Sequence, residues 1–295
     1  MKTTRWLAFC LTLACFLLLL SACHKTQQQQ ASDRPRLTTK TTMRDVTFHS
    51  VSLNRDMQYR VILPASIAAG QKLPVVYLLH GGGGGFRDWS NYSDVSNWAE
   101  HGLILVMPEG GDSYYTNAVK RPEDRFEDYI VKDLISEVEA KFPVKIGRSS
   151  RAIVGVSMGG FGAIKLALKY PDLFVFAGGL SSALDVPSRP FSIKRISQWR
   201  GHRAIFGAWQ GHTQHENDPY LLANSADVAR ATYMFLSCGE QEGLLPANRR
   251  FAALLAHRKF PYEFHSGLGN HDWNQWNGWL TILFQSLSEH INTRS

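Results

Sequence analysis

Short apolar runs alternate along this chain with longer segments in which apolar residues recur every three or four positions. Such runs are typical of strands buried on both faces of a parallel sheet, and the longer segments of helices that bury one face against it. The alternation predicts an α/β fold with a mostly parallel, doubly wound sheet. The expected strands are residues 73–79, 103–107, 152–156, 173–177, 232–237 and 262–265.

Helices are expected between these strands. In the segment 127–142, Glu137 and Lys141 lie one turn apart opposite the apolar residues, as in a surface helix packed on a sheet. Lys165 and Lys169 are also one turn apart, which predicts that both lie on the outward side of their helix. The expected helices are residues 89–101, 127–142, 161–170 and 248–257.

Two further segments extend this pattern. From Asp45 to Leu63 apolar and polar residues alternate, which predicts an antiparallel hairpin at the sheet edge with residues 54–56 in its turn. Residues 184–230 form a small helical insertion before the strand at 232–237, with a basic run at 189–203 that contains no acidic residue. This run either caps a site that admits anionic or glycan substrates or is a solvated face of packed helices, and the pattern favours the second interpretation.

The motif Gly155-Val156-Ser157-Met158-Gly159-Gly160 stands between an expected strand and an expected helix. Its spacing is the G-x-S-x-G nucleophile elbow, a turn too tight for a Cβ at the flanking glycines. The turn exposes the Ser157 oxygen at the carboxyl edge of the sheet, where ligands of such sheets bind. Ser157 is therefore the predicted nucleophile.

A run of glycines follows the first apolar strand, in His80-Gly81-Gly82-Gly83-Gly84-Gly85. A phosphate-binding loop of the Walker type needs a following Gly-Lys-Ser/Thr, which this run lacks. We interpret the run as one wall of an oxyanion hole, in which the N–H groups of Gly82 and Met158 receive the developing negative charge.

A serine nucleophile needs a base and an acid. Of the eleven histidines, His271 alone lies in a loop after the last expected strand, from which it can reach the sheet edge. Two carboxylates, Glu240 and Glu242, follow the strand at 232–237, and Glu242 is the preferred acid. The order serine, acid, histidine is the order of α/β-hydrolases.

The first residues have the composition of an export signal. Lys2 and Arg5 precede an apolar core that is too short to span a membrane. The ending Leu20-Ser21-Ala22-Cys23 resembles the lipobox of bacterial lipoproteins, which implies a signal peptide at 1–22 and a diacylglycerol and palmitate anchor on Cys23. By the same resemblance, His24 favours the outer membrane of a Gram-negative cell envelope.

Residues 23–42 are expected to be a flexible tether, because they include four consecutive glutamines and lack apolar periodicity. The remainder, 43–295, is expected to be one catalytic domain that contains the insertion at about 184–230. Cys238 is the one cysteine of this domain, which therefore has no intrachain disulfide.

Charge and motifs exclude some partners. The formal net charge is +7, or +5 without the signal residues Lys2 and Arg5, an excess that suits an anionic envelope. No basic run is interleaved with aromatic residues, so we expect no nucleic-acid partner. No motif implies a metal or a cofactor.

Six motifs recur together in one family. They are His80-Gly81-Gly82, Tyr115-Thr116-Asn117, Glu127-Asp128-Tyr129, the nucleophile elbow, Cys238-Gly239 and Gly269-Asn270-His271-Asp272-Trp273. Over about residues 45–290 the chain resembles the esterase D-like branch of α/β-hydrolases, which includes tributyrin esterases, S-formylglutathione hydrolases, feruloyl esterases and secreted mycolyltransferases. The resemblance implies the α/β-hydrolase fold, with Ser157 as nucleophile, His271 as base and Gly82 as the first oxyanion donor. Glu242 takes the acid position, where most relatives carry aspartate.

The function expected from these motifs is a serine carboxylic-ester hydrolase that acts on short-chain or small acyl esters through an acyl-enzyme. Three alternatives stay open: an acyltransferase to a sugar or lipid hydroxyl, a thioesterase similar to S-formylglutathione hydrolase, and a binding protein without catalysis. The residues expected to contact a small-molecule ester are Trp89, Tyr115, Asn117 and Trp273.

Overall fold

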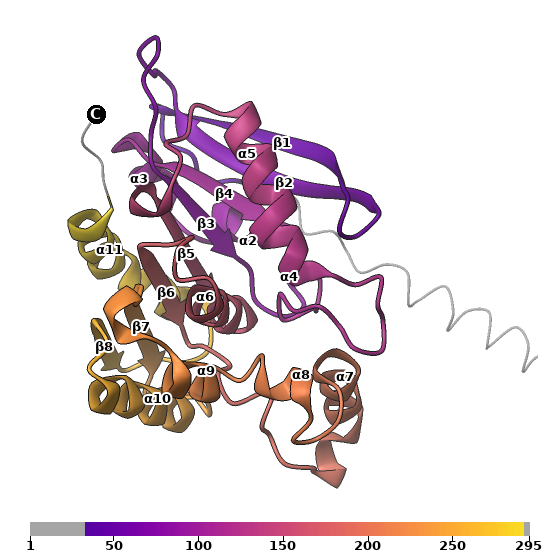
Figure 1. The fold of residues 1–295 in the computed structure, drawn as a ribbon. Helices are drawn as coiled ribbons and strands as arrows, with labels where there is room; N and C mark the ends of the chain where they lie inside the picture. The colour runs from indigo at the N-terminus through magenta and orange to yellow at the C-terminus, as the bar shows by residue number, and fades with distance from the viewer. Residues whose placement is uncertain (1–32, 292–295) are drawn as a thin grey trace, which may run out of the picture. The chain divides into compact units, whose positions relative to one another are not determined.

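One eight-stranded sheet organises the part of the chain that the computed structural model describes, residues 33–291 (Figure 1). The strand order is β1-β2-β4-β3-β5-β6-β7-β8; neighbours from β4 to β8 are parallel, while β1, β2 and β4 pair antiparallel. The predicted fold class is confirmed. The strands are β1 (Thr41–Ser50), β2 (Arg55–Pro64), β3 (Val75–Leu79), β4 (Ile104–Pro108), β5 (Arg151–Val156), β6 (Phe176–Leu180), β7 (Tyr233–Gly239) and β8 (Tyr262–Gly267).

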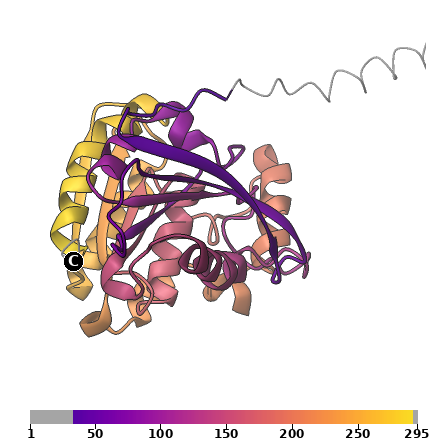
Figure 2. The ribbon, with the colours of Figure 1, turned by 90° about the horizontal axis from the view of Figure 1, so that it is seen from above.

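Helices cover both faces of this sheet. One face packs against the continuous helical segment α4–η1–α5 and against α6, α9 and α10, and the other face packs against α2, α3 and α11. Seen from above, the indigo β1–β2 hairpin lies nearest the viewer and the yellow α11 runs along one side (Figure 2). The α-helices and the π-helical turn are α2 (Asp88–Tyr92), α3 (Ser96–Glu100), α4 (Phe126–Asp128), η1 (Tyr129–Leu134), α5 (Ile135–Lys141), α6 (Met158–Lys169), α7 (Ile196–Phe206), α8 (His212–His215), α9 (Pro219–Ser225), α10 (Leu245–Arg258) and α11 (Trp273–His290). Three short 3-10 turns are η2 (Arg148–Ser150), η3 (Ile193–Arg195) and η4 (Val228–Arg230).

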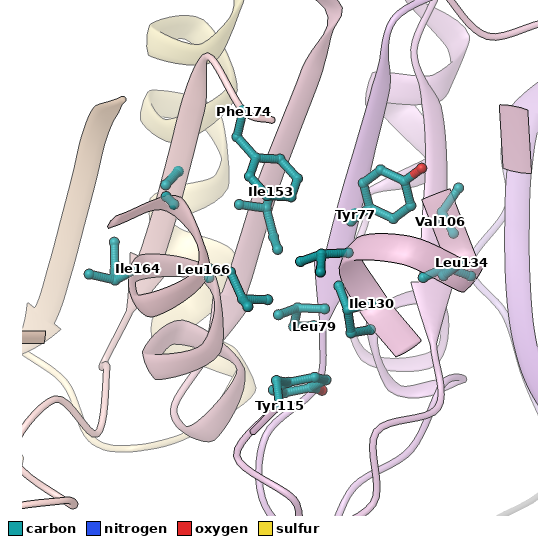
Figure 3. Close-up of a cluster of buried hydrophobic side chains, with 14 of the residues drawn as sticks. Tyr77, Leu79, Val106, Tyr115, Ile130, Leu134, Ile153, Ile164, Leu166 and Phe174 are labelled. Carbon is teal, nitrogen blue, oxygen red and sulfur yellow. The ribbon is translucent and has the colours of Figure 1, made fainter. Parts of the chain in front are cut away.

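The central strand β3 shows why the inner parallel strands are largely apolar. Val75, Tyr77 and Leu79 point into one layer of the core, and Val76 and Leu78 into the other. All five side chains are fully buried, because helices cover both faces. Figure 3 shows the first layer, in which side chains of the sheet meet side chains of the η1 turn and of α6.

The antiparallel hairpin is confirmed, but its turn covers residues 51–54, where Asn54 has a φ of +48°; Arg55 and Asp56, expected in the turn, already pair with β1. The helix expected at 89–101 is divided into α2 and α3. At the division Ser93 is extended, and both its N–H and its hydroxyl donate to the Trp89 carbonyl at the end of α2. The strand expected at 173–177 begins three residues later, at Phe176, where pairing with Ala152 of β5 starts.

The prediction that Lys165 faces outward is wrong. Its side chain is fully buried, and Nζ donates to Glu127 Oε2 at 2.7 Å, to the Tyr115 carbonyl at 2.6 Å and to Thr116 Oγ1 at 2.9 Å. Lys169, one turn later, reaches Glu127 Oε1 at 2.6 Å. The reason is that α6 lies between the sheet and the 115–127 segment, which covers the side of α6 that carries Lys165.

Replacing Glu127 by glutamine is expected to lower the free energy of unfolding by about 3–5 kcal/mol, because the Lys165 charge stays buried without its carboxylate. Burial disfavours the ionised Glu127, but the Lys165 and Lys169 charges outweigh it and lower its pKa to about 2. The contribution of this carboxylate to the free energy of unfolding is therefore complete above its ordinary pKa near 4.5, and it is lost as the pH falls toward 2. Urea denaturation at pH 7 and pH 3 measures both effects.

The matched control is Glu123→Gln, since Glu123 is exposed a few residues earlier in the same segment. The double variant Glu127→Gln/Lys165→Met removes both charges and should recover part of the lost stability. Equal unfolding midpoints for the Glu127→Gln and Glu123→Gln variants would contradict this account.

The folded unit begins before the boundary expected at residue 43. The Arg36 N–H donates to the Ser90 carbonyl at 2.7 Å, and Ser96 Oγ donates to the Arg36 carbonyl at 2.7 Å, so the last residues of the expected tether pack on the domain. The expected signal peptide at 1–22 and Cys23 lie outside the described residues, and the lipid anchor stays a prediction. Within residues 33–291, no helix is long and apolar enough to cross a bilayer.

Candidate active site

The Ser157 turn joins β5 to α6 at the carboxyl edge of the sheet. Ser157 has a φ of +56° and a ψ of −112°, a conformation rare for a residue with a side chain. A Cβ on Gly155 would lie 2.2 Å from the carbonyl carbon of Gly159, and a Cβ on Gly159 would lie 2.2 Å from the Leu79 carbonyl oxygen. The two glycines are therefore required for the turn to close against β3.

His271 lies beside this serine, in the loop between β8 and α11. Its Nε2 is 2.8 Å from Ser157 Oγ, across 114 residues of sequence, and its Nδ1 is 2.7 Å from Glu242 Oε2. Because an ionised carboxylate only accepts hydrogen bonds, Nδ1 carries the proton and Nε2 accepts from the serine hydroxyl. The structure thus brings together the three residues predicted as nucleophile, base and acid.

The Glu242 carboxylate also accepts hydrogen bonds from groups other than His271. Its Oε1 accepts hydrogen bonds from Ser181 Oγ at 2.6 Å and from the Gly239 N–H at 2.8 Å. Burial favours the neutral acid, but the hydrogen bonds from His271, Ser181 and Gly239 prevail and lower the pKa of Glu242. Glu240 is exposed to solvent, so the geometry favours Glu242 over Glu240 as the partner of His271.

Ser181 and Trp276 form a supporting layer that the sequence motifs did not reveal. Ser181 follows β6 with a φ of +48°, and its Oγ accepts a hydrogen bond from Trp276 Nε1 at 3.0 Å while it donates to Glu242. The Trp276 ring also meets the His271 ring edge-on at 5.2 Å. The position of Ser181 at the carboxyl end of a parallel strand was the one available signal.

The two predicted oxyanion donors lie near each other beside Ser157, since a Cβ on Gly82 would lie 4.0 Å from the Met158 Cβ. Met158 is the first residue of α6, so its N–H has no partner within the helix and carries the positive end of the helix dipole. Gly82 follows Gly81, whose added Cβ would lie 3.5 Å from the Ser157 Cβ. Among the described residues, no hydrogen bond occupies the N–H of Gly82 or of Met158.

His80 fixes the glycine loop that carries Gly82. Its Nδ1 is 2.8 Å from the Gly81 carbonyl, and its Nε2 accepts a hydrogen bond from the Gly110 N–H at 2.9 Å. This pattern requires the proton on Nδ1 and anchors the loop to the segment after β4. The Gly83 N–H donates to Asp112 Oδ1 at 2.7 Å on the other side of Gly82.

Two cavities adjoin the Ser157–His271 pair. The cavity on the His271 side has a volume of about 620 Å³, and the insertion supplies most of its wall. The second cavity, of about 490 Å³, is lined by Gly82 and Met158 and by residues of α7. Gln198 and His202 line both, so the insertion covers the two sides of the site.

His202 is an uncharged polar group at the junction of these cavities. Burial lowers its pKa to about 4, and the nearby Arg189 and Arg203 charges act in the same direction. Its Nε2 is 3.2 Å from the Tyr114 hydroxyl, which can donate to a neutral imidazole. At neutral pH this pair therefore presents polar groups to the site without adding charge.

Two of the residues expected to contact substrate are buried and support the glycine loop instead. Trp89 is 1% exposed and donates from Nε1 to the Leu79 carbonyl at 3.0 Å. Tyr115 has no exposed surface, and its hydroxyl donates to the His80 carbonyl at 3.0 Å. Both bonds hold the end of β3, from which the glycine loop starts. We correct their role from substrate contact to support of this loop.

The other two residues also lie away from the cavity walls. Asn117 donates from Nδ2 to Asp128 Oδ2 at 3.0 Å, which fixes the start of the α4 segment. Trp273 packs against the rings of Trp89 and Trp276 at 5.2 and 5.0 Å. Neither residue lines either cavity, because neighbouring groups engage both side chains.

The arrangement is suited to nucleophilic catalysis. The Ser157 oxygen, the imidazole hydrogen-bonded to it and two amide N–H groups lie close together at the carboxyl edge of the sheet, as transfer of an acyl group requires. Within residues 33–291, no cluster of three or more histidine, cysteine, aspartate or glutamate side chains has the geometry to bind a metal ion.

The chain is similar to known esterases and serine hydrolases. Residues 50–285 match the family model Esterase, described as "Putative esterase". The chain is 24% identical to an acetyl esterase of Caldicellulosiruptor saccharolyticus, over 83% of this chain and 97% of that protein. It is similar in structure to the Staphylococcus aureus serine hydrolase FphF, with a TM-score of 0.72, 26% identity, and coverage of 85% of this chain and 99% of the other. The S-formylglutathione hydrolase FrmB of the same organism gives a TM-score of 0.69 and 25% identity, with the same coverage of both chains.

Proposed function

The chain belongs to the Esterase family of α/β-hydrolases and is a carboxylic ester hydrolase, and on this basis we propose that Ser157, His271 and Glu242 are its catalytic triad. The observation that carries the proposal is the unbroken hydrogen-bonded series from Ser157 Oγ through the His271 imidazole to the Glu242 carboxylate. Each distance lies within the range of a formed hydrogen bond. A serine in such a series loses its proton as it attacks.

Acylation is the first half of the reaction. Ser157 Oγ attacks the ester carbonyl carbon, and its proton passes to His271 Nε2. The Glu242 carboxylate stabilises the imidazolium that forms, without itself taking the proton. The N–H groups of Gly82 and Met158 hold the carbonyl oxygen as it becomes negative, and each such donor is worth about 3 kcal/mol in the transition state.

The tetrahedral intermediate then collapses. The bond to the alcohol oxygen breaks, and His271 returns its proton to that oxygen, which leaves the acyl group on Ser157. Water next takes the place of the alcohol, and His271 removes a proton from it as it attacks the acyl carbonyl. The bond between the acyl carbon and Ser157 Oγ then breaks, His271 returns the proton to that oxygen, and the carboxylic acid departs.

We propose that the acyl group is small. The cavity that holds the two oxyanion donors has a volume of about 490 Å³, and Tyr114, His202 and Ile205 stand among its walls. Because the acyl chain extends from the carbon whose oxygen lies on these donors, this cavity limits its size. A preference for short acyl chains agrees with the likeness to an acetyl esterase.

A fluorophosphonate probe tests the assignment of the nucleophile. We expect the folded protein to bind one probe, on the peptide that contains Ser157, because the phosphonyl oxygen occupies the oxyanion site during attack. Peptide mapping by mass spectrometry locates the label, and heat-unfolded protein and the variant His271→Ala serve as controls, each with at least about 100-fold slower labelling. A label on another serine would contradict the proposed triad.

A further inference from the structure

The insertion that covers the active site is strongly basic. Between Asp185 and Glu216 the sequence contains no acidic residue. The lysines and arginines in this interval are Arg189, Lys194, Arg195, Arg200 and Arg203.

Three of these cations line the cavity on the His271 side, where two carboxylates also lie. Arg189 is neutralised, because its Nε and Nη2 donate to Asp185 Oδ1 at 3.0 and 2.7 Å. The carboxylate of Glu242 already accepts hydrogen bonds from His271 and from Ser181. Among the described residues, the other two cations have no carboxylate partner, and the three cations outnumber the two carboxylates of the lining by one.

These two charges belong to Lys194 and Arg195, in the η3 turn that leads into α7. In the part of the chain that the structure describes, neither has a carboxylate within ion-pair distance. Both side chains are exposed, so they can rearrange toward a ligand in the cavity. The low pKa of His202, caused by burial and by the nearby arginines, agrees with a positive potential at this wall.

The position of the cavity indicates which half of the ester it receives. His271 returns its proton to the departing alcohol, and His271 lines this cavity. Gly82 and Met158, which receive the carbonyl oxygen, line the other cavity. The alcohol half of a bound ester therefore extends toward η3, and the acyl half toward Tyr114.

We infer that the enzyme prefers esters whose alcohol half carries an anionic group, a carboxylate or a phosphate, and that Lys194 and Arg195 determine this preference. The inference rests on the proposed function, because it places the alcohol half by the role of His271. A cleft with an excess of one sign of charge concentrates ligands of the opposite sign, and a tenfold effect is ordinary for two unpaired charges at low salt.

The test compares 4-acetoxybenzoate with the uncharged 4-acetoxybenzamide, which differ in charge at the far end of the alcohol. For the native protein and for each variant, kcat/KM for 4-acetoxybenzoate is divided by kcat/KM for 4-acetoxybenzamide. The two leaving groups differ in reactivity by the same factor for every protein, so this factor cancels when the ratios are compared. We expect this ratio to fall about tenfold in Lys194→Gln/Arg195→Gln. It should stay unchanged in the control Arg200→Gln, since Arg200 is exposed on α7 but lines neither cavity. A parallel series with 4-acetoxyphenyl phosphate shows whether carboxylate or phosphate is preferred.

Several outcomes would overturn the inference. One is a ratio of kcat/KM values that is unchanged in Lys194→Gln/Arg195→Gln. Another is an equal fall of this ratio in Arg200→Gln, which would indicate that the overall positive charge of the surface, and not these two residues, causes the preference. A preference for anionic acyl groups, tested with 4-nitrophenyl hemisuccinate against the neutral 4-nitrophenyl butyrate, would place the anion on the wrong half. In each of these outcomes the protein would still hydrolyse the acetate ester of 4-acetoxybenzamide, so the proposed function would stand. By contrast, no hydrolysis of either acetate ester by the native protein would contradict the proposed function as well.

Discussion

Replacing Ser157 by alanine is expected to lower kcat for a 4-nitrophenyl ester of a short-chain acid by about 10⁶-fold. The variant has no oxygen to form the acyl-enzyme, while the N–H groups of Gly82 and Met158 still polarise the carbonyl. Slow direct attack by water is therefore the residual reaction. Steady-state kinetics after fluorophosphonate treatment, which removes contaminating serine hydrolases, measures the residual rate.

Ser182 provides the matched control for this variant. It lies in the loop after β6, it is fully buried, and among the described residues its Oγ has no hydrogen-bond partner. The variant Ser182→Ala should therefore hydrolyse the same ester within a few-fold of the native rate. An unchanged midpoint of thermal unfolding in Ser157→Ala would show that the loss is chemical. Full activity of that variant would disprove the role of Ser157 as nucleophile.

Replacing Glu242 by glutamine is expected to lower kcat by about 10⁴-fold. A glutamine side chain has nearly the same shape, but its NH₂ group cannot accept the hydrogen bond from His271 Nδ1. The imidazole then adopts the tautomer with its proton on Nε2, which cannot accept the Ser157 proton. The variant also lacks the negative charge that stabilises the imidazolium. The pH dependence of kcat and the fluorophosphonate labelling rate report the same change independently.

The matched control is Glu240→Gln, two residues earlier in the same turn. Glu240 is exposed, and among the described residues its carboxylate makes no bond to His271, so its loss should change kcat by less than about twofold. A large loss in Glu240→Gln together with an active Glu242→Gln would reverse the assignment of the acid. Equal losses of kcat in both variants would indicate that either substitution disturbs the conformation of the turn.

Local patterns in the sequence predicted the sheet well. Burial on both faces leaves the central strands β3 and β5 few positions for a polar residue, so their apolar runs are visible without a structure. The Ser157 turn is equally visible in a short motif, although only Gly155 is required by a contact within that motif, while Gly159 is required by its contact with Leu79 of the neighbouring β3. The site residues Ser157, His271 and Glu242 were found by their places after strands, since parallel strands bring their carboxyl ends to one edge.

The sequence by itself determined the fold class, the edge of the sheet at which chemistry is expected and the family, because each depends on periodicity or on a short motif. Tertiary structure alone decided which side chains meet. Lys165 has the spacing of a surface residue, and only the segment that passes over α6 makes it a buried partner of Glu127. Ser181 and Trp276 support Glu242 from segments far apart in the chain, and Lys194 and Arg195 of the insertion line the same cavity as His271. The physical reason is that charge pairing, hydrogen bonding and cavity shape depend on distances between remote segments, which no local pattern contains.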